Sequence, residues 1–241
     1  MSREGLEASE AMRAAAIWAI VPVKTLALAK ARLAPVLPAP IRRQLVLTML
    51  EDVLELLLGK PAVDRVLVVT ADAEVCALAR DRGAMALQED DASGLNPAVR
   101  RGVAYARGHG ADRMLYLPAD VPLATSAEID QIVTPALHSP SAVIVSARDG
   151  DGTNALFFSP AGAFDPSFGA GSFARHCRQA VANGLRLRVL RLSGVGADID
   201  EAADLATLLK SDRGPSRYGF LEPAMRVLAL VEHEQSGAKG S

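Results

Sequence analysis

The stretch Ile17-Trp-Ala-Ile-Val-Pro-Val23 is a nearly continuous apolar run that is followed at once by the cation Lys24. A short apolar run rich in β-branched residues predicts a strand covered on both faces, as in a mostly parallel sheet. Three further runs share this character: 65–70, 114–118 and 142–146. Three shorter or less regular runs are also predicted to be strands: 84–88, 154–158 and 187–192. The sequence therefore predicts a buried central sheet.

Segments of helical period separate these apolar runs. The clearest is the segment in which one apolar residue recurs every four positions: Ile41, Leu45, Met49, Val53 and Leu57. Five more segments are predicted to be helical: 74–82, 97–107, 127–137, 173–183 and 201–210. Regular alternation of strand and helix predicts an α/β fold with a mostly parallel central sheet flanked by helices. Ligands bind such sheets beyond the carboxyl ends of the strands, so we expect the site in those loops.

The composition excludes several classes of protein. The chain has 241 residues, 50% hydrophobic and 22% charged, which is typical of a globular protein. Lys and Arg number 26 against 28 Asp and Glu, so no broad cationic field attracts nucleic acid or an anionic membrane. Cys76 and Cys177 lie far apart without a metal-binding spacing, as is common in the reducing cytoplasm. We expect a cytoplasmic protein without nucleic-acid or membrane partners.

The two ends differ in character from the rest of the chain. We expect a flexible leader over residues 1–14, one domain over 15–212, and a tail over 213–241. Apolar residues between Phe220 and Val231 predict one short amphipathic helix in that tail. The apolar stretch from Ala14 to Val23 is too short to cross a bilayer, and no cationic segment precedes it, so no signal peptide is expected.

A basic loop follows the first predicted strand. Lys24, Lys30 and Arg32 lie within nine residues, and the loop has no glycine. It is therefore neither a Walker A loop nor a dinucleotide-binding fingerprint, which need glycines so that backbone amides can approach phosphate. If phosphates bind here, these side chains must supply much of the compensating charge. A solvated surface loop is the structural alternative.

Three carboxylates stand at positions that favour metal binding. Asp120 lies between two prolines at the end of a predicted strand, and Asp198 and Asp200 share one face if their segment is extended. Neighbouring carboxylates repel each other, and oxygen ligands completed by substrate phosphate suit Mg²⁺. The alternatives are a turn residue at Asp120 and a helix cap at Asp200.

Three glycine-marked loops complete the candidates: 93–96, 148–154 and 168–173. Gly94 leaves room for a planar base, whose edge Asn96 is able to hydrogen-bond. Ser172 is expected just before a helix, where free amides suit a carboxylate or phosphate. Each loop has a plain turn as its alternative. No nucleophile motif is present, and no catalytic role is assigned to the four histidines, His109, His138, His176 and His233.

In chain order, these motifs resemble one family. They are Val21-Pro-Val-Lys24 with Ala29-Lys-Ala-Arg-Leu33, Gly94-Leu-Asn96, Leu117-Pro-Ala-Asp120-Val-Pro122, Asp151-Gly-Thr153-Asn154, Phe168-Gly-Ala-Gly171-Ser-Phe173-Ala-Arg-His176 and Asp198-Ile-Asp200. The chain resembles the 2-phospho-L-lactate guanylyltransferase family, whose bacterial members are also called phosphoenolpyruvate guanylyltransferases. The resemblance runs from about Ile17 to Leu209. It implies a single nucleotidyltransferase domain of the glycosyltransferase-A-like type, acting in biosynthesis of the deazaflavin coenzyme named factor 420.

The resemblance also implies roles for individual residues. The ligands of one or two Mg²⁺ ions would be Asp120, Asp198 and Asp200. The catalytic residues, which would also face the triphosphate of GTP, would be Lys24, Lys30 and Arg32. The guanine would lie against Gly94, Leu95 and Asn96, and the carboxylate of the acid against Thr153, Gly169 and Ser172. The chain departs from the family at two of the quoted motifs, with Ala31 where Ser is usual and Pro97 where Ala is common.

The implied reaction joins GMP from GTP to the phosphate of a three-carbon phospho-acid and releases pyrophosphate. No general base is needed, because a phosphomonoester with a second pKa near ~6 is already anionic at neutral pH. Phosphoenolpyruvate is the favoured acceptor, while 2-phospho-L-lactate and 3-phospho-D-glycerate stay open. A downstream transferase would use the product, and a homodimer is compatible with the sequence.

Two alternatives stay open. One is a nucleotidyltransferase with a molybdopterin or sugar-phosphate acceptor, although those families typically carry a glycine-rich first loop. The other is a non-catalytic nucleotide-binding protein, since a fold does not fix a function. Three candidate metal ligands argue against the second.

Overall fold

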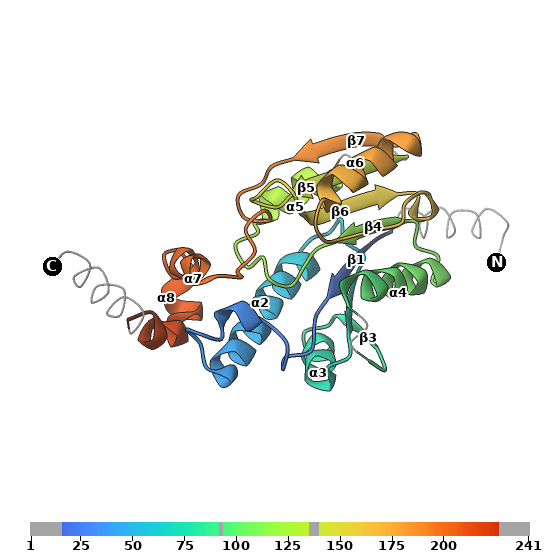
Figure 1. Cartoon of the computed structure of the whole chain (residues 1–241). Helices are drawn as coiled ribbons and strands as arrows, with labels where there is room; N and C mark the ends of the chain where they lie inside the picture. Colours follow the sequence, from blue (N-terminus) through green and yellow to red (C-terminus); the bar gives the residue numbers. More distant parts are fainter. Residues whose placement is uncertain (1–15, 92–93, 135–139, 227–241) are drawn as a thin grey trace.

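One seven-stranded sheet organises the computed structural model, which describes residues 16–91, 94–134 and 140–226. The strand order is β3-β2-β1-β4-β6-β5-β7 (Figure 1). The strands are β1 Ile17–Pro22, β2 Arg65–Thr70, β3 Met85–Gln88, β4 Arg113–Tyr116, β5 Ser141–Ser146, β6 Thr153–Ser159 and β7 Arg186–Leu190. All seven coincide with predicted runs. Strand β6 is antiparallel to β4 and β5, whereas the other pairs are parallel, which confirms the mostly parallel sheet.

Helices connect the strands as predicted. They are α2 Ala39–Leu58, α3 Ala73–Asp81, α4 Leu95–Gly108, α5 Ser126–Val133, α6 Ser172–Ala182, α7 Ala202–Leu209 and the short α8 Gly214–Arg217. Single 3₁₀ turns lie at η1 Ala31–Leu33, η3 Ala161–Ala163 and η4 Gly219–Leu221. The segment predicted as helical to residue 137 ends as α5 at Val133, and residues 135–139 lie outside the described part of the chain.

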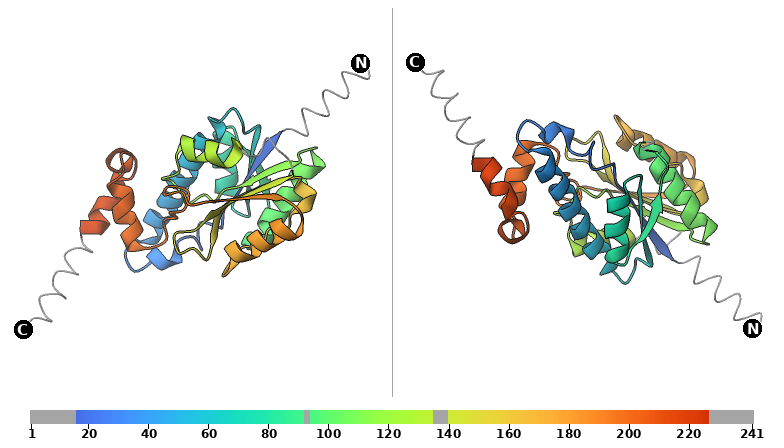
Figure 2. Two further views of the ribbon diagram at one scale, coloured as in Figure 1. Left: turned by 90° about the horizontal axis from the view of Figure 1, so that it is seen from above. Right: turned by 90° about the horizontal axis from the view of Figure 1, so that it is seen from below.

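The helices form a layer on each face of the sheet (Figure 2). Along β1, Ile17, Ala19 and Val21 belong to one apolar cluster, while Trp18 and Ile20 belong to the other. The first cluster includes residues of α2, α3 and α5, and the second includes residues of α4 and α6. Because both faces are covered, the strands read as continuous apolar runs rather than as alternating ones.

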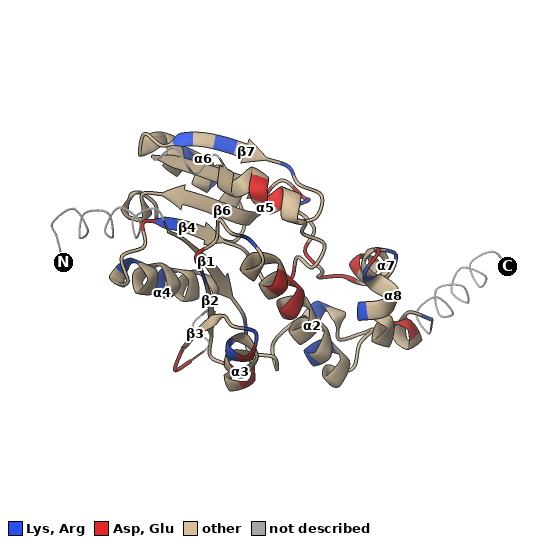
Figure 3. Ribbon diagram, turned by 180° about the vertical axis from the view of Figure 1, so that it is seen from behind, with Lys and Arg blue, Asp and Glu red and all other residues tan. Residues whose placement is uncertain are grey.

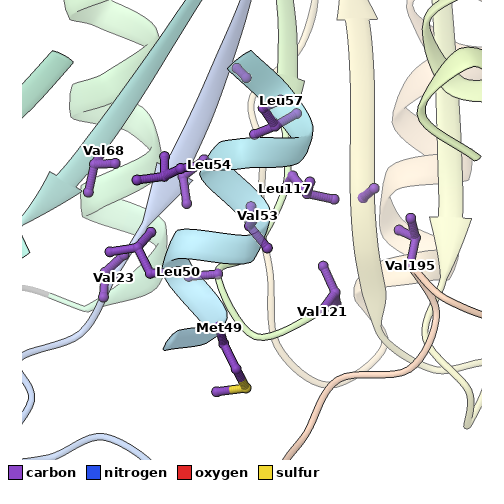
Figure 4. Packing of buried hydrophobic residues seen from close by; sticks show 14 of the residues in the cluster. Val23, Met49, Leu50, Val53, Leu54, Leu57, Val68, Leu117, Val121 and Val195 are labelled. Atoms are coloured by element: carbon purple, nitrogen blue, oxygen red, sulfur yellow. The ribbon is translucent and has the colours of Figure 1, made fainter. Parts of the chain in front are cut away.

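Helix α2 supplies the largest helical share of the first cluster. Leu45, Met49, Val53 and Leu57, spaced four residues apart, are all at most 1% exposed. Figure 4 shows the helix packed between the first two strands and the chain that follows β4 and β7. This contact fixes the loops after β1 and β4 relative to each other.

Helix α8 and the residue after it contact α2 through a buried carboxylate. Asp52 is 3% exposed and accepts hydrogen bonds from the Arg217 Nε, at 2.8 Å, and from the Tyr218 hydroxyl. Arg217, the basic residue of α8, also pairs with Glu51 of α2 at 2.7 Å, and Figure 3 shows the acidic part of α2 and the basic part of α8. Tyr218 and Leu221 are fully buried in the first cluster. The packed domain thus extends beyond residue 212, where we expected it to end.

The expected helix of the tail differs in position from the prediction. Helix α8 begins at Gly214, before the predicted segment, and residues 222–226 are again helical. The remainder of that segment and the predicted leader over residues 1–14 lie outside the described residues. Within residues 16–91, 94–134 and 140–226, no helix combines the length and the apolar character needed to cross a membrane.

Candidate functional site

One edge of the sheet gathers the predicted site residues. The parallel strands β1 and β4 end there, and their loops carry Lys30 and Asp120. The antiparallel β6 begins at the same edge, so Thr153, its first residue, lies there as well. The segment after β7 joins them, because the Ile199 N–H donates to the Asp120 carbonyl at 3.0 Å. The location agrees with the expectation for an α/β sheet.

Lys30 lies at the centre of the charged groups. Its Nζ is 2.6 Å from Asp120 Oδ2 and 2.7 Å from Asp200 Oδ1, and only 7% of its side chain is exposed. Burial would lower the pKa of this ammonium group, but the two carboxylates outweigh burial, so its pKa is raised. Its backbone is left-handed, with φ 53°, which is uncommon for a residue with a side chain. The loop is thus bent so that Lys30 bridges two carboxylates.

The third carboxylate faces the same space. Burial is the main reason that the pKa of Asp198 is raised, and the Asp120 carboxylate raises it further. Asn154 opposes this shift, because its Nδ2 donates to Asp198 Oδ1 at 3.2 Å. Burial, Asp120 and Asp198 together raise the pKa of Tyr116 on β4. The site therefore carries repulsion between carboxylates that Lys30 relieves only in part.

Asp200 does not act as the helix cap considered above. The residue that caps α7 is Glu201, and the N–H groups of Asp200 and Glu201 both donate to Asp204 Oδ2, at 3.0 and 2.8 Å. Asp204 is held from its other side by Arg148 NH1 at 2.9 Å. The Asp200 carboxylate is left to face Lys30.

The three carboxylates do not close around a common point. Among the described residues, no group of three or more histidine, cysteine, aspartate or glutamate side chains is arranged to hold a metal ion. The Lys30 ammonium group lies between Asp120 and Asp200, where a shared cation was expected. The sequence-based metal assignment therefore stays a prediction.

The other two cations of the basic loop face solvent. Lys24 is exposed, and the Arg32 side chain is 73% exposed with its NH1 3.8 Å from Asp200 Oδ2. The loop itself is anchored by a residue that sequence reasoning missed. Asp72 caps α3 through Oδ1 and accepts from the Leu26 N–H through Oδ2 at 3.0 Å. Its position directly after the end of β2 was the available signal.

In the segment predicted to bind guanine, Gly94 is open as expected, but the side chain of Asn96 already has hydrogen-bond partners. Gly94 has φ 96° and ψ 174°, a conformation open almost only to glycine, and no atom of the described residues outside its neighbours in sequence lies within 4 Å of the position a Cβ would take. Asn96, however, is engaged by backbone: its Nδ2 donates to the Phe168 carbonyl at 3.1 Å, and its Oδ1 accepts from the Phe168 N–H at 2.7 Å. Asn96 therefore joins the start of α4 to the loop before α6. Pro97 lies in the first turn of α4, where a missing N–H costs little.

The loop before α6 is held from several sides. Asp151 accepts from the Gly171 N–H through Oδ2 at 2.7 Å, and its carbonyl accepts from the Phe173 N–H at 3.0 Å. Gly169 and Gly171 both have positive φ, 113° and 67°. Helix α6 begins at Ser172, with Gly171 rather than Ser172 as its capping residue. Ser172 is 1% exposed, and its N–H donates to the Gly169 carbonyl at 3.0 Å, so the first two amides of α6 already have partners.

A histidine that sequence reasoning left without a role completes this half of the site. His176 is fully buried, and its Nδ1 lies 3.0 Å from the Thr153 hydroxyl. Its Nε2 accepts from the Ser167 N–H at 2.9 Å. The signal was its place at the end of the quoted motif 168–176. A separate hollow of about 380 Å³ between α4 and α6 is lined by none of the predicted site residues.

Comparison with known proteins agrees with this geometry. A family model described as guanylyl transferase CofC like matches residues 17–238. The chain belongs to this family. A phosphoenolpyruvate guanylyltransferase of Sphaerobacter thermophilus is 45% identical over 79% of this chain and 91% of its own length. A 2-phospho-L-lactate guanylyltransferase of Methanothermobacter thermautotrophicus is 33% identical over 84% of this chain and 88% of its own length.

Solved structures with low sequence identity share the fold of this CofC-like guanylyltransferase. A nucleotidyl transferase of Methanothermobacter thermautotrophicus superposes with a TM-score of 0.59 at 20% identity, over 86% of this chain and 99% of that one. A protein of Desulfovibrio desulfuricans, described as a nucleotide-diphospho-sugar transferase, gives 0.70 at 19% identity, over 87% and 96%. The fold is thus the nucleotidyltransferase type that the resemblance implied, and the chain is a nucleotidyltransferase.

Proposed function

We propose that this chain transfers GMP from GTP to the phosphate of phosphoenolpyruvate and releases pyrophosphate, in biosynthesis of the deazaflavin coenzyme factor 420. The observation that carries the proposal is the meeting of Lys30, Asp120 and Asp200 within 2.7 Å at the ligand-binding edge, in a chain of this family. Relatives named for phosphoenolpyruvate and for 2-phospho-L-lactate both support a three-carbon phospho-acid as acceptor.

The donor groups fit magnesium in kind. Asp120, Asp198 and Asp200 offer oxygen alone, and Mg²⁺ commonly takes one or two carboxylates together with water and substrate phosphate. Burial is the main cause of the raised pKa of Asp198, and the Asp120 carboxylate adds to it, so negative charge remains here that a cation would neutralise. When bound, the ion would supply positive charge to the phosphates as they approach each other.

The three cationic side chains of the loop after β1 are proposed to have two different roles. Lys24 and Arg32 are exposed and lie on the loop that leaves β1, so they are able to meet the triphosphate. Lys30, held by two carboxylates, would keep that loop at the sheet edge and offset part of the acidic charge. Phosphoryl transfer of this kind depends on positioning and on charge compensation rather than on a general base.

The acceptor acid and the guanine of GTP are proposed to bind on either side of the charged residues Lys30, Asp120 and Asp200. Thr153, Gly169 and Ser172 would take the carboxylate of the acid, where the first residue of β6 lies near the start of α6. The segment of Gly94, Leu95 and Asn96 would lie against the guanine, and among the described residues nothing fills the space beside Gly94. We further propose that the protein acts in the cytoplasm, as a monomer or homodimer, and passes its product to a downstream transferase.

The test is pyrophosphate release with GTP and Mg²⁺, run in parallel with phosphoenolpyruvate, 2-phospho-L-lactate and 3-phospho-D-glycerate. We expect release with GTP and phosphoenolpyruvate, and loss of release with ATP or with EDTA. Release with another of the three acids would correct the acceptor alone. Silence with all three from folded protein would refute the proposal and favour another acceptor or a nucleotide-binding role.

A matched pair of variants tests the site. Asp120→Asn should lower kcat by about 10²-fold or more, because it weakens a proposed Mg²⁺ ligand and the ion pair that holds Lys30 at the sheet edge. Asp130→Asn is the control, since Asp130 also pairs with a lysine, Lys60, at 2.7 Å, but lies on α5. Equal activity of the two variants would contradict the assignment of Asp120.

A further inference from the structure

His176 connects the two segments that the proposed function assigns to the acid. Its Nδ1 lies 3.0 Å from the hydroxyl of Thr153, the first residue of β6. Its Nε2 lies 2.9 Å from the backbone nitrogen of Ser167, at the start of the loop that leads to Gly169. The imidazole is fully buried, with the ring centroids of Phe164 and Phe168 5.6 and 5.1 Å away.

These contacts determine which nitrogen carries the proton. A backbone N–H is only a donor, so the Nε2 facing Ser167 must hold a lone pair. The imidazole is neutral, because burial lowers the pKa of His176 to about 4 and the neighbouring Arg175 acts in the same direction. A neutral ring without a proton on Nε2 carries it on Nδ1. Nδ1 therefore donates to the Thr153 hydroxyl oxygen.

The proton on Nδ1 fixes the direction of the next hydrogen bond. The Thr153 oxygen accepts from His176, so the hydroxyl hydrogen points to a different partner. The side chain is thereby prepared to donate to an acceptor at the sheet edge. A carboxylate is such an acceptor, and a hydrogen bond to it is stronger than one between neutral groups.

We propose that His176 is a positioning residue that makes the Thr153 hydroxyl an obligate donor to the carboxylate of the acceptor acid, while it ties β6 to the loop before α6. The inference rests on the proposed function for the identity of the acid. It adds a role for a residue that would touch neither substrate, and it explains why this buried ring needs two polar contacts.

The test uses the fact that glutamine and asparagine each imitate one ring nitrogen. His176→Gln places an amide near the Nε2 position, so the link to Ser167 is kept and the donor to Thr153 is lost. His176→Asn places its amide near the Nδ1 position, so the donor to Thr153 is kept and the link to Ser167 is lost. We expect His176→Gln to raise the KM for phosphoenolpyruvate by about tenfold with the KM for GTP unchanged, since a hydrogen bond to a charged group is weakened.

A double-mutant cycle with Thr153→Val separates this role from a general effect on packing. The valine removes the hydroxyl, so His176→Gln should raise the KM for phosphoenolpyruvate no further in that background. His176→Asn acts through the Ser167 link, so its effect should persist there. Independent, multiplying effects of Thr153→Val and His176→Gln would overturn the proposal, as would an unchanged KM in the single His176→Gln variant.

A spectroscopic measurement distinguishes failure of this inference from failure of the proposed function. ¹⁵N NMR of histidine-labelled protein at pH 7 should show His176 as the neutral Nδ1–H tautomer, with the resonance assigned by its loss in His176→Gln. The Nε2–H tautomer or an imidazolium would overturn the inference, even in an active enzyme. An inactive wild-type chain with the Nδ1–H tautomer would overturn the proposed function alone. His109→Gln, at the exposed far end of α4, is the control for the substitution itself.

Discussion

Asn96 offers a test between a role in reading guanine and a role in holding the site together. Replacing it by alanine removes the amide that donates to the Phe168 carbonyl at 3.1 Å and accepts from the Phe168 N–H at 2.7 Å. The two residues lie 72 positions apart, so this pair of bonds joins distant parts of the chain. If the amide is structural, its loss should affect both the stability of the protein and the loop before α6, which is proposed to bind the acid.

The magnitude follows from the two bonds. Each contributes about 1 kcal/mol net, and an unsatisfied backbone group in a buried setting costs more. Phe168 is 7% exposed, so both of its backbone groups would be left with poor access to water. We expect Asn96→Ala to lower the free energy of unfolding by about 2–4 kcal/mol.

The assay is urea denaturation, combined with the KM values for GTP and for the acid. The KM for the acid should rise several-fold, because the loop before α6 loses one of its supports, while the KM for GTP changes less. Asn183→Ala is the matched control, since its Nδ2 also bonds a backbone carbonyl, that of Ala163 at 2.6 Å, but at the exposed end of α6. A tenfold rise in the KM for GTP with unchanged stability would refute this reasoning and restore the guanine contact.

Two further outcomes follow from buried polar groups. Tyr218→Phe should lower the free energy of unfolding by about 1–3 kcal/mol, because it leaves a buried oxygen of Asp52 without one donor. Urea denaturation measures this change, and no KM should change with it. An unchanged stability would contradict the importance of this contact. His176, with its pKa lowered to about 4, stays neutral in the folded chain while the unfolded chain gains a proton below pH 6.5. The free energy of unfolding should therefore fall as pH falls, by about 2 kcal/mol more between pH 7 and 5 in wild type than in His176→Gln, and equal slopes would disprove this linkage.

Most of the fold was predictable because it rests on local patterns. Strands buried on both faces produce apolar runs, and α2 repeats its apolar residues every four positions. The direction of β6 was not predictable, because a run of Asn154-Ala-Leu-Phe-Phe158 buried on both faces looks the same for either direction. The extension of the domain past residue 212 was also hidden, since the partner of Tyr218 is Asp52, 166 positions earlier.

The charged half of the site was easier to predict than its hydrogen-bonding half. Lys30, Asp120 and Asp200 follow strands, and strand ends meet at one edge, so their proximity follows from topology. The partners of Asn96 and His176 are backbone groups in a loop far along the chain or a hydroxyl on another strand. A side-chain amide or imidazole has many equivalent partners, and sequence alone does not select among them.

The reversed strand β6 has a consequence for how this enzyme is able to vary. The paired residues Met114↔Phe158 and Tyr116↔Leu156 fix the register of β6 on β4, while the turn over residues 147–152 joins β6 to β5 at the ligand edge. A longer or shorter turn would reshape the neighbourhood of Thr153 and leave those pairs in place. The loops after β1 and β4 belong to separate connections, so such a change would reach them only through side-chain contacts such as Arg148–Asp204. The sides proposed for the acceptor and for the nucleotide therefore lie on separate connections of one edge, which the Arg148–Asp204 and Asn96–Phe168 contacts couple.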